Sequence, residues 1–434
     1  MDSKEWHLLN FEILEKTLNS KQNMPFHTIR KDALHKFSEL GFPTVRDETW
    51  KYTSIKQILK HNFRWSSQSA VISEINIKKF KFKNIDQNVL VFVNGNFNKE
   101  LSQIDSVNNG IVITNLADAF HNYGDLVNKY LSKTAKYDSE AFTALNTAYV
   151  HDGAFIHIPD GEIIKNPIHL LYISDSGSDI FHFHPRNLII AGKNSQCHII
   201  ESYNHTSDNK YLCNLVTELL VQENANVEHI KIQDESETAY HISSSYITQG
   251  KNSVYTSINI DLGGALVRNN INILLNGEYC ECNLFGFNLA HNKQHIDNHT
   301  LIDHAVANCN SNESFKAIID DKAKGVFNGK VLVRQDAQKT NAFQSNKTLL
   351  LTDHATMNSK PELEIFADDV KCSHGATIGQ LDEEALFYLR TRGISKEMAN
   401  SMLQFAFAED ILENIKIDSV RKKLNNLIHD KFIS

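Results

Sequence analysis

Short alternating runs dominate the middle of the chain, from about residue 151 to residue 377. In runs such as 254–260 and 271–275, apolar side chains recur at every second position. Successive side chains of a strand point to opposite faces, so this pattern predicts strands that bury one face. Turns rich in asparagine, glycine and aspartate separate the runs, and no long helical pattern interrupts them.

A weak repeat runs through this region. The tetrapeptide Gly-Lys-Asn-Ser occurs at 192–195 and at 250–253, each time before an extended run, and similar asparagine-bearing turns lie at Glu223 and Asn276. Asparagine and glycine tolerate the left-handed backbone that tight corners require. Strand–turn units that cannot bury a face alone stack into a solenoid, which predicts a β-helix. A β-sandwich or jelly roll is the alternative, because short strands and turn signals are common to both.

Helical spacing of apolar residues marks the amino-terminal part of the chain. The residues at this spacing are Phe11, Leu14 and Leu18 in one stripe and Ile29, Ala33, Phe37 and Leu40 in a second. Gly41 and Pro43 are expected to end the second helix. Between residues 66 and 150 the pattern is mixed: residues 89–97 predict a strand with an Asn-Gly turn, and residues 138–147 predict a helix.

Helices are predicted again after Thr377. Asp382 is the expected N-cap of a helix that ends before Gly393, with acidic residues in its first turn and arginines near its end, as the helix dipole favours. Ser395 is expected to begin the next helix. The apolar residues at helical spacing here are Met398, Met402 and Phe405, followed by Val420, Leu424 and Ile428. The pattern therefore divides the chain into helical residues 1–65, mixed residues 66–150, β-helix residues 151–377 and helical residues 378–434.

Composition narrows the function classes. The 434 residues carry a formal net charge of -8, which gives no overall electrostatic reason to bind nucleic acid or an anionic membrane. No apolar run approaches the about 20 residues that a membrane helix needs, and the amino-terminal sequence does not resemble a signal peptide. A cytoplasmic protein is expected.

Six cysteines lie far apart, at positions 197, 213, 280, 282, 309 and 372. A disulfide framework is built in short secreted chains with dense cysteines, so free thiols in a reducing compartment are expected. No Cys-x-x-Cys pair occurs, which argues against a zinc ribbon or a cysteine-only cluster motif. Cys280 and Cys282 are two residues apart, and a buried strand face explains them.

Cys372 and His374 stand where a predicted strand meets a predicted helix. Residues i and i+2 of a strand face the same side, so the thiol and the imidazole can share a metal ion or a partner. Both groups are good iron ligands, but two ligands are too few to hold one ion stably. A partner chain would supply the others. The competing interpretation is packing, since free cysteine is among the most buried residue types.

Several long motifs identify a family. The segments are GFPTVRDETWKYT at 41–53, QHIDNHTLIDH at 294–304, KGVFNGKVLVRQDAQKT at 324–340, FQSNKTLLLTD at 343–353 and KPELEIFADDVKCSHGAT at 360–377, followed by GQLDEEALFYLRTRGI at 379–394. With these segments the chain resembles, over nearly its whole length, the SufD subunits of the Suf iron–sulfur cluster assembly machinery.

The resemblance implies a fold, partners and a site. The implied fold is mainly β, a right-handed parallel β-helix core flanked by amino-terminal and carboxy-terminal helical regions. The implied role is that of a non-catalytic scaffold that aids iron acquisition and cluster formation at its interface with a SufB-like subunit, and whose carboxy-terminal helices dock a SufC-like ATPase. His374 then ranks above Cys372 at that interface. Iron or a cluster would be shared there transiently, with no permanently bound cofactor and no assigned metal.

Other candidate residues have simpler explanations. His295, Asp297, His299 and Asp303 line one side of a predicted strand and could bind a metal, but a solvated face of the β-helix is the preferred interpretation. Residues 325–331 are one residue too short for a phosphate-binding loop and have Val331 where a magnesium ligand would stand. Trp50 is expected to be a packing anchor.

The sequence leaves open one other function and one other assembly state beside the scaffold role. Many solenoids cleave glycans along an acidic groove, so a stand-alone carbohydrate-active enzyme is the alternative, with Asp297 or Asp303 as its carboxylates. The required secretion signal is missing, and no Gly-x-Ser-x-Gly motif or catalytic carboxylate pair stands out, so no catalytic residue is assigned. A homodimer through a free β-helix edge is also compatible with the scaffold role.

Overall fold

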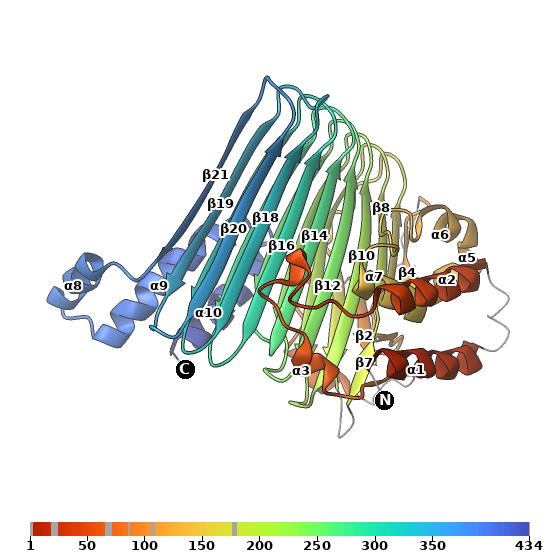
Figure 1. Ribbon diagram of the computed structural model, residues 1–434, viewed down its shortest axis with the longest axis horizontal. Helices are drawn as coiled ribbons and strands as arrows, with labels where there is room; N and C mark the ends of the chain where they lie inside the picture. Colours follow the sequence, from red (N-terminus) through yellow and green to blue (C-terminus); the bar gives the residue numbers. More distant parts are fainter. Residues whose placement is uncertain are drawn as a thin grey trace.

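The computed structural model describes residues 3–18, 25–65, 72–85, 87–105, 109–175 and 180–433. Its core is a parallel β-helix, in which successive strands from β8 onward alternate between two sheets (Figure 1). The first sheet runs in the order β20 (Thr356–Ile365), β18 (Lys324–Val333), β16 (His295–His304), β14 (Leu266–Leu275), β12 (Tyr240–Gln249), β10 (Tyr211–Val221), β8 (Arg186–Ala191), β5 (Ala154–Ile158) and β4 (Val112–Asn115), with β7 (Phe181–Phe183) and β1 (Arg64–Trp65) at its side. The mainly β architecture predicted from the sequence is confirmed.

The second sheet runs in the order β21 (Lys371–Gly379), β19 (Asn341–Leu350), β17 (Asn310–Ile319), β15 (Glu281–Ala290), β13 (Val254–Asp261), β11 (Asn226–Asp234), β9 (Gln196–His205), β6 (Ile168–Ser174), β2 (Val89–Val93) and β3 (Asn96–Phe97). Neighbouring core strands pair in parallel, so Ile230 lies beside Ile258, and Glu313 beside Gln344. Each turn of the coil thus stacks on the one before it, about 30 residues earlier.

Asparagine residues form the corners that the weak repeat predicted. Asn194, Asn224 and Asn252 have φ angles of 56°, 56° and 55°, in the left-handed region. Their side chains stack in a ladder, in which Asn252 donates to Asn224 at 3.0 Å and Asn224 donates to Asn194 at 2.9 Å. The short polar side chain both tolerates this backbone and joins consecutive turns. The predicted turn role is confirmed.

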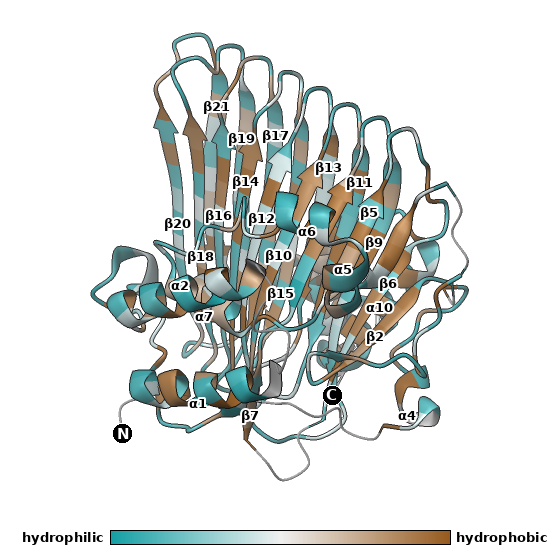
Figure 2. Ribbon diagram, turned by 90° about the vertical axis from the view of Figure 1, so that its right-hand side faces the viewer, coloured by the Kyte–Doolittle hydropathy of each residue, from teal (hydrophilic) through white to brown (hydrophobic). Residues whose placement is uncertain are grey.

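In the middle of the coil, the strands with the alternating pattern are buried on both of their faces. In β13 the apolar residues Ile258 and Ile260 face outward, while Tyr255, Asn259 and Asp261 face the interior. In β14 the apolar residues of the predicted strand face inward instead. Figure 2 shows how apolar and polar positions alternate along the strands. The sequence pattern therefore predicted the strands but not which face lies inside.

Helices α9 (Lys396–Leu412) and α10 (Asp418–Ile433) cover the outer face of the second sheet. Ile411, Leu412 and Val420 pack there against outward residues such as Ile258. Ser395 caps α9, and Asp382 caps the preceding helix α8 (Glu383–Thr391), as predicted. The prediction that the apolar stripe of α9 is a packing face is wrong, because Met398 and Met402 of this stripe are exposed.

The amino-terminal helices pack at the other side of the molecule. They are α1 (Ser3–Leu18), α2 (Pro25–Leu40), η2 (Glu48–Trp50), α3 (Lys56–Leu59), α4 (Glu74–Lys78), α5 (Leu116–Asn122), α6 (Gly124–Tyr130) and α7 (Ala141–Tyr149). Phe11, Leu14, Ala33 and Phe37 are buried against α7 as the stripes predicted, whereas Leu40 is exposed. The Asn-Gly turn at residues 94–95 joins β2 to β3, and the helix predicted at 138–147 is α7, which begins three residues later.

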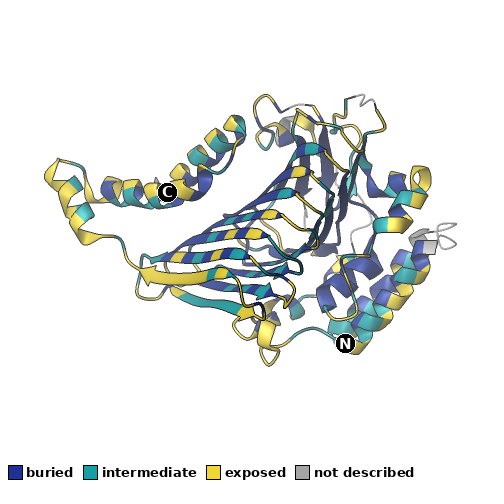
Figure 3. Ribbon diagram, turned by 90° about the horizontal axis from the view of Figure 1, so that it is seen from above, coloured by how far each residue is buried: buried dark blue, intermediate teal, exposed yellow. Residues whose placement is uncertain are grey.

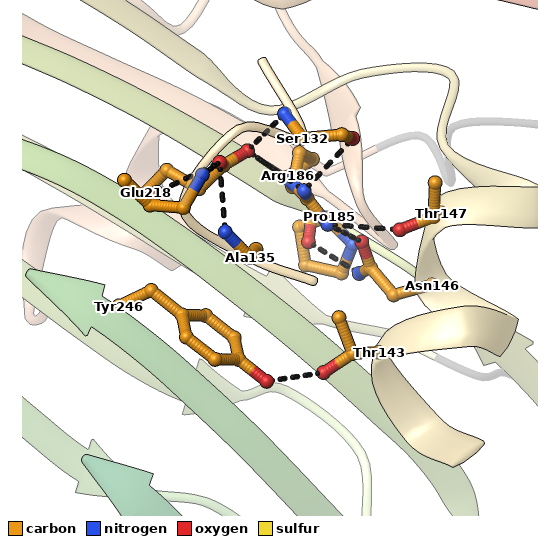
Figure 4. A network of polar contacts seen from close by, with 10 residues as sticks. Ser132, Ala135, Thr143, Asn146, Thr147, Pro185, Arg186, Glu218 and Tyr246 are labelled. Carbon is orange, nitrogen blue, oxygen red and sulfur yellow. Dashed lines mark hydrogen bonds and ion pairs between the residues drawn. The ribbon is translucent and has the colours of Figure 1, made fainter. Parts of the chain in front are cut away.

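A buried ion pair of the coil contacts the amino-terminal region (Figure 4). Arg186 of β8 and Glu218 of β10 are fully buried and lie 2.7 Å apart. The carboxylate also accepts hydrogen bonds from the backbone amides of Ser132, Thr134 and Ala135, at 2.7, 3.1 and 3.1 Å. Donors thus surround both oxygens, which offsets the cost of burying the charge.

Candidate functional site

The last turn of the coil is uncovered on its outer end. Among the described strands, β20 pairs only with β18 and β21 only with β19, so each ends its sheet. Along β21 nearly every residue is exposed, in contrast to the strands before it (Figure 3). An edge of this kind presents unpaired backbone amides and carbonyls, which is the feature that another strand can complete.

Cys372 and His374 both lie on β21, on the side that faces the interior. Cys372 is in register with Ala342 of β19, and His374 is in register with Gln344, and both β19 residues are buried. Residues in register on neighbouring parallel strands share a face. His374 is nevertheless exposed, because no further turn covers this end of the coil. The packing interpretation is therefore wrong for His374.

Cys372 is half-buried and packs against the small apolar cluster of the last turn, which includes Val331 and Ala342. Burial raises the pKa of its thiol, although a backbone hydrogen bond at Ala342 acts the other way. The thiol therefore stays protonated at neutral pH until a cation or partner stabilises the thiolate. No group of three or more metal-binding side chains occurs among the described residues.

Polar side chains from neighbouring strands lie behind the pair, and they were not singled out from the sequence. Ser359 of β20 donates a hydrogen bond across the interior to Asn346 of β19, at 3.0 Å. Gln344, beside His374, donates to Glu313 of β17 at 2.7 Å. The signal that could have found them is the spacing of about 30 residues between turns, which places residues 313, 344 and 374 in one column.

Helix α8 projects from the coil beyond β21 (Figure 1). It has no buried residue, and the relative exposures of Phe387 and Tyr388 are 70% and 58%. Exposed aromatic side chains on one helix are typical of a surface that a partner covers. The open strand edge and α8 are two separate exposed surfaces near the carboxy-terminal end.

The histidine and aspartate stripe of β16 is not a solvated face, and this prediction is wrong at its centre. Asp297 is fully buried and accepts hydrogen bonds from Thr53 and from Arg268, the latter at 2.6 Å. Burial alone would raise the pKa of Asp297, but Arg268 and His299 hold it well below its usual range. Trp50 covers this group, with the Arg268 guanidinium 4.0 Å from its ring, so the expected packing role of Trp50 is confirmed.

The remaining sequence candidates are structural. All six cysteines are free thiols, and Cys280 and Cys282 are buried as predicted. A hydrogen bond from Cys309, in the next turn, lowers the pKa of Cys280 to about 7. Residues 325–331 lie within strand β18, so they form no phosphate-binding loop. Among the described residues no helix is both long and apolar enough to cross a membrane.

Comparisons with known proteins identify the family. The family model described as SufBD protein N-terminal region matches residues 1–170, and the SufBD core domain of SUF system FeS cluster assembly matches residues 172–407. An iron-sulfur cluster assembly SufBD family protein of Synechocystis is 36% identical, over 92% of this chain and 89% of its own length. The iron-sulfur cluster assembly protein SufD of Escherichia coli is 28% identical over 97% and 94%, and SufD of Bacillus subtilis is 25% identical over 96% of each chain. None of these relatives supports a carbohydrate-active enzyme.

Proposed function

The chain belongs to the SufBD family and has a role in iron–sulfur cluster assembly, and we propose that it acts there as a non-catalytic scaffold subunit of a SufBCD-type complex. The observation that carries the proposal is the uncovered last turn of the coil, with Cys372 and His374 on its inner side. A scaffold of this kind holds cargo at an interface and needs no catalytic residue of its own.

A SufB-like subunit is the proposed partner of the open end. A strand of that subunit can pair with β20 or β21 and continue the sheets, which satisfies the free backbone groups. The side chains of Cys372 and His374 would then lie inside the junction rather than in solvent. Iron or a nascent cluster, as cargo, would receive these two ligands from this chain and the others from the partner.

A SufC-like ATPase is the proposed partner of the carboxy-terminal helices. Helix α8 exposes Phe387 and Tyr388, while α9 and α10 pack on the coil. ATP hydrolysis would then occur in the partner.

A homodimer is the proposed state when the SufB-like subunit is absent. A second copy of this chain would then pair with the open end. Six free thiols favour a reducing, cytoplasmic setting.

Co-purification from cells that express all three proteins tests the scaffold. We expect the tagged chain to retain both partners. Ala376→Arg, on the inner side of the exposed β21, should release the SufB-like subunit alone, whereas Phe387→Asp should release the ATPase alone. Lys347→Ala, exposed on β19, serves as the control that keeps both. Recovery of the unmodified chain without either partner would contradict the proposal.

A further inference from the structure

A column of inward side chains leads through the coil to His374. In the second sheet, Leu284, Glu313, Gln344 and His374 occupy the same register position on β15, β17, β19 and β21. Neighbouring strands of a sheet are about 4.8 Å apart, so each of these side chains lies directly beside the next. Gln344 is therefore the immediate inner neighbour of His374.

Gln344 is held in place through the nitrogen atom of its side-chain amide. Its Nε2 atom donates to the Oε2 atom of Glu313 at 2.7 Å, and Thr300 donates to the other carboxylate oxygen at 2.6 Å. The Gln344 side chain is 4% exposed, and its Oε1 atom is buried without a hydrogen-bond partner in the described structure. A buried acceptor without a donor is unfavourable, so this oxygen is ready to accept an N–H.

The facing sheet leaves room for this amide. Gly329 of β18 lies opposite Gln344, and a Cβ atom at position 329 would clash with the Gln344 Nε2 atom and with the ring of Phe327. This is an independent indication that the interior is shaped around the glutamine amide. It also gives a reason for the second glycine in the segment 325–331, which has no phosphate-binding role.

We propose that Gln344 is a positioning residue for His374. The amide oxygen of Gln344 accepts one N–H of the imidazole, which selects one neutral tautomer and directs the lone pair of the other ring nitrogen toward the open end. Histidines that bind metal commonly donate their second N–H to a carbonyl or carboxylate in this way. Glu313 and Thr300 fix the amide from behind. The inference rests on the proposed function, because it gives His374 its ligand role.

The imidazole nitrogen signals of the full-length chain test the contact directly. They are recorded by NMR with ¹⁵N-labelled histidine, and His374 is assigned by its loss in His374→Asn. We expect a single tautomer in the unmodified chain and a mixture in Gln344→Met, while Lys347→Met, exposed on the same strand, changes nothing. An identical tautomer population with and without Gln344 would overturn the inference. If Gln344→Met does not fold, Gly329→Ala takes its place, because it displaces the amide and should give the same mixture.

Cluster assembly in cells that lack their own homologue gives the second readout. Changes to residues that orient metal ligands commonly cost 10–100-fold, so we expect His374→Ala and Gln344→Met each to reduce the activity of an iron–sulfur enzyme at least about tenfold. The double variant should be no worse than His374→Ala, whereas fully additive losses would overturn the coupling. If His374→Ala has no effect, the proposed function fails, and the tautomer measurement alone decides whether the contact exists.

Discussion

His374 and Cys372 share one face of one strand, yet their surroundings differ. Cys372 packs partly against the apolar cluster of the last turn, which raises the pKa of its thiol, whereas His374 is exposed beside the polar Gln344. An imidazole offers a lone pair at neutral pH without losing a proton first, while a thiol with a raised pKa must first be deprotonated. Under the proposed function, the environment favours His374 over Cys372 as the first ligand for iron.

Replacement of these two residues tests that ranking. We expect His374→Ala to leave soluble yield and partner binding unchanged while it reduces cluster assembly in cells about tenfold or more. Cys372→Ala should have a milder effect, because the raised pKa of its thiol makes it the weaker of the two proposed ligands. The measurement is the activity of an iron–sulfur enzyme together with co-purification. The reverse order of effects, or equal loss of soluble protein in both variants, would contradict the ranking.

Buried histidines make stability depend on pH. His7 is 2% exposed, and burial lowers its pKa to about 4 from its ordinary value of 6.5. Between these two values the unfolded chain binds a proton that the folded chain does not, so stability falls as the pH falls through this window. His7 alone contributes about 2 kcal/mol to the loss between pH 7 and pH 5.

Urea unfolding of the unmodified chain and of His7→Asn at the two pH values isolates this contribution. We expect the variant to lose about 2 kcal/mol less stability than the unmodified chain on going from pH 7 to pH 5. The comparison cancels the other groups that titrate in this range. Equal losses in the two proteins would show that His7 is protonated in the folded state at pH 5.

At the scale of elements, the sequence predicted the helix caps and the corners of the coil, because each of these depends on a few neighbouring residues. The caps Asp382 and Ser395 and the corner residue Asn194 act on the backbone next to them, so their roles could be read from the sequence. The inner and outer faces of β13 could not, because both are buried: one faces the interior and the other lies under α9 and α10. The alternation of apolar and polar residues does not by itself show which face of a strand lies in the interior and which lies under a helix.

For the candidate site as well, the sequence predicted the features within one segment but not the contacts between segments. The shared face of Cys372 and His374 follows from the strand period within one segment and is confirmed. Gln344 and Glu313 join them only through the register of three successive turns, which no local pattern specifies. The burial of Asp297 was missed for a related reason, since Thr53, its hydrogen-bond partner, lies far away in the sequence.

Glu218 is one of the residues that join the amino-terminal region to the coil. Removing one partner of a buried ion pair leaves the other charge uncompensated, so Glu218→Ala should lower the free energy of unfolding by about 3–5 kcal/mol. Glu223→Ala breaks the exposed pair of Glu223 with Lys193 and should cost less than about 1 kcal/mol. Urea unfolding measures both. Similar small losses would mean that the backbone donors around Glu218 are readily hydrated.

At the scale of the whole molecule, helices cover parts of the coil and leave its carboxy-terminal end open. The amino-terminal helices lie at one end, and α9 and α10 cover the outer face of the second sheet. The opposite end, formed by β20 and β21, is open, and α8 projects beside it (Figures 1 and 3). The polar column to His374 ends at this opening. The architecture thus separates the open strand edge from the exposed helix α8, which are the two proposed partner surfaces.

Amide hydrogen exchange tests most directly that the open end is the assembly surface. It is compared between the chain alone and the chain bound to a SufB-like subunit, without the ATPase. We expect the amides of Thr356–Ile365 and Lys371–Gly379 to exchange at least about tenfold more slowly in the complex, because the edge strands gain a partner, while the exchange of α8 is unchanged. Unchanged exchange in both strands, with protection on α8 or the amino-terminal helices instead, would contradict it.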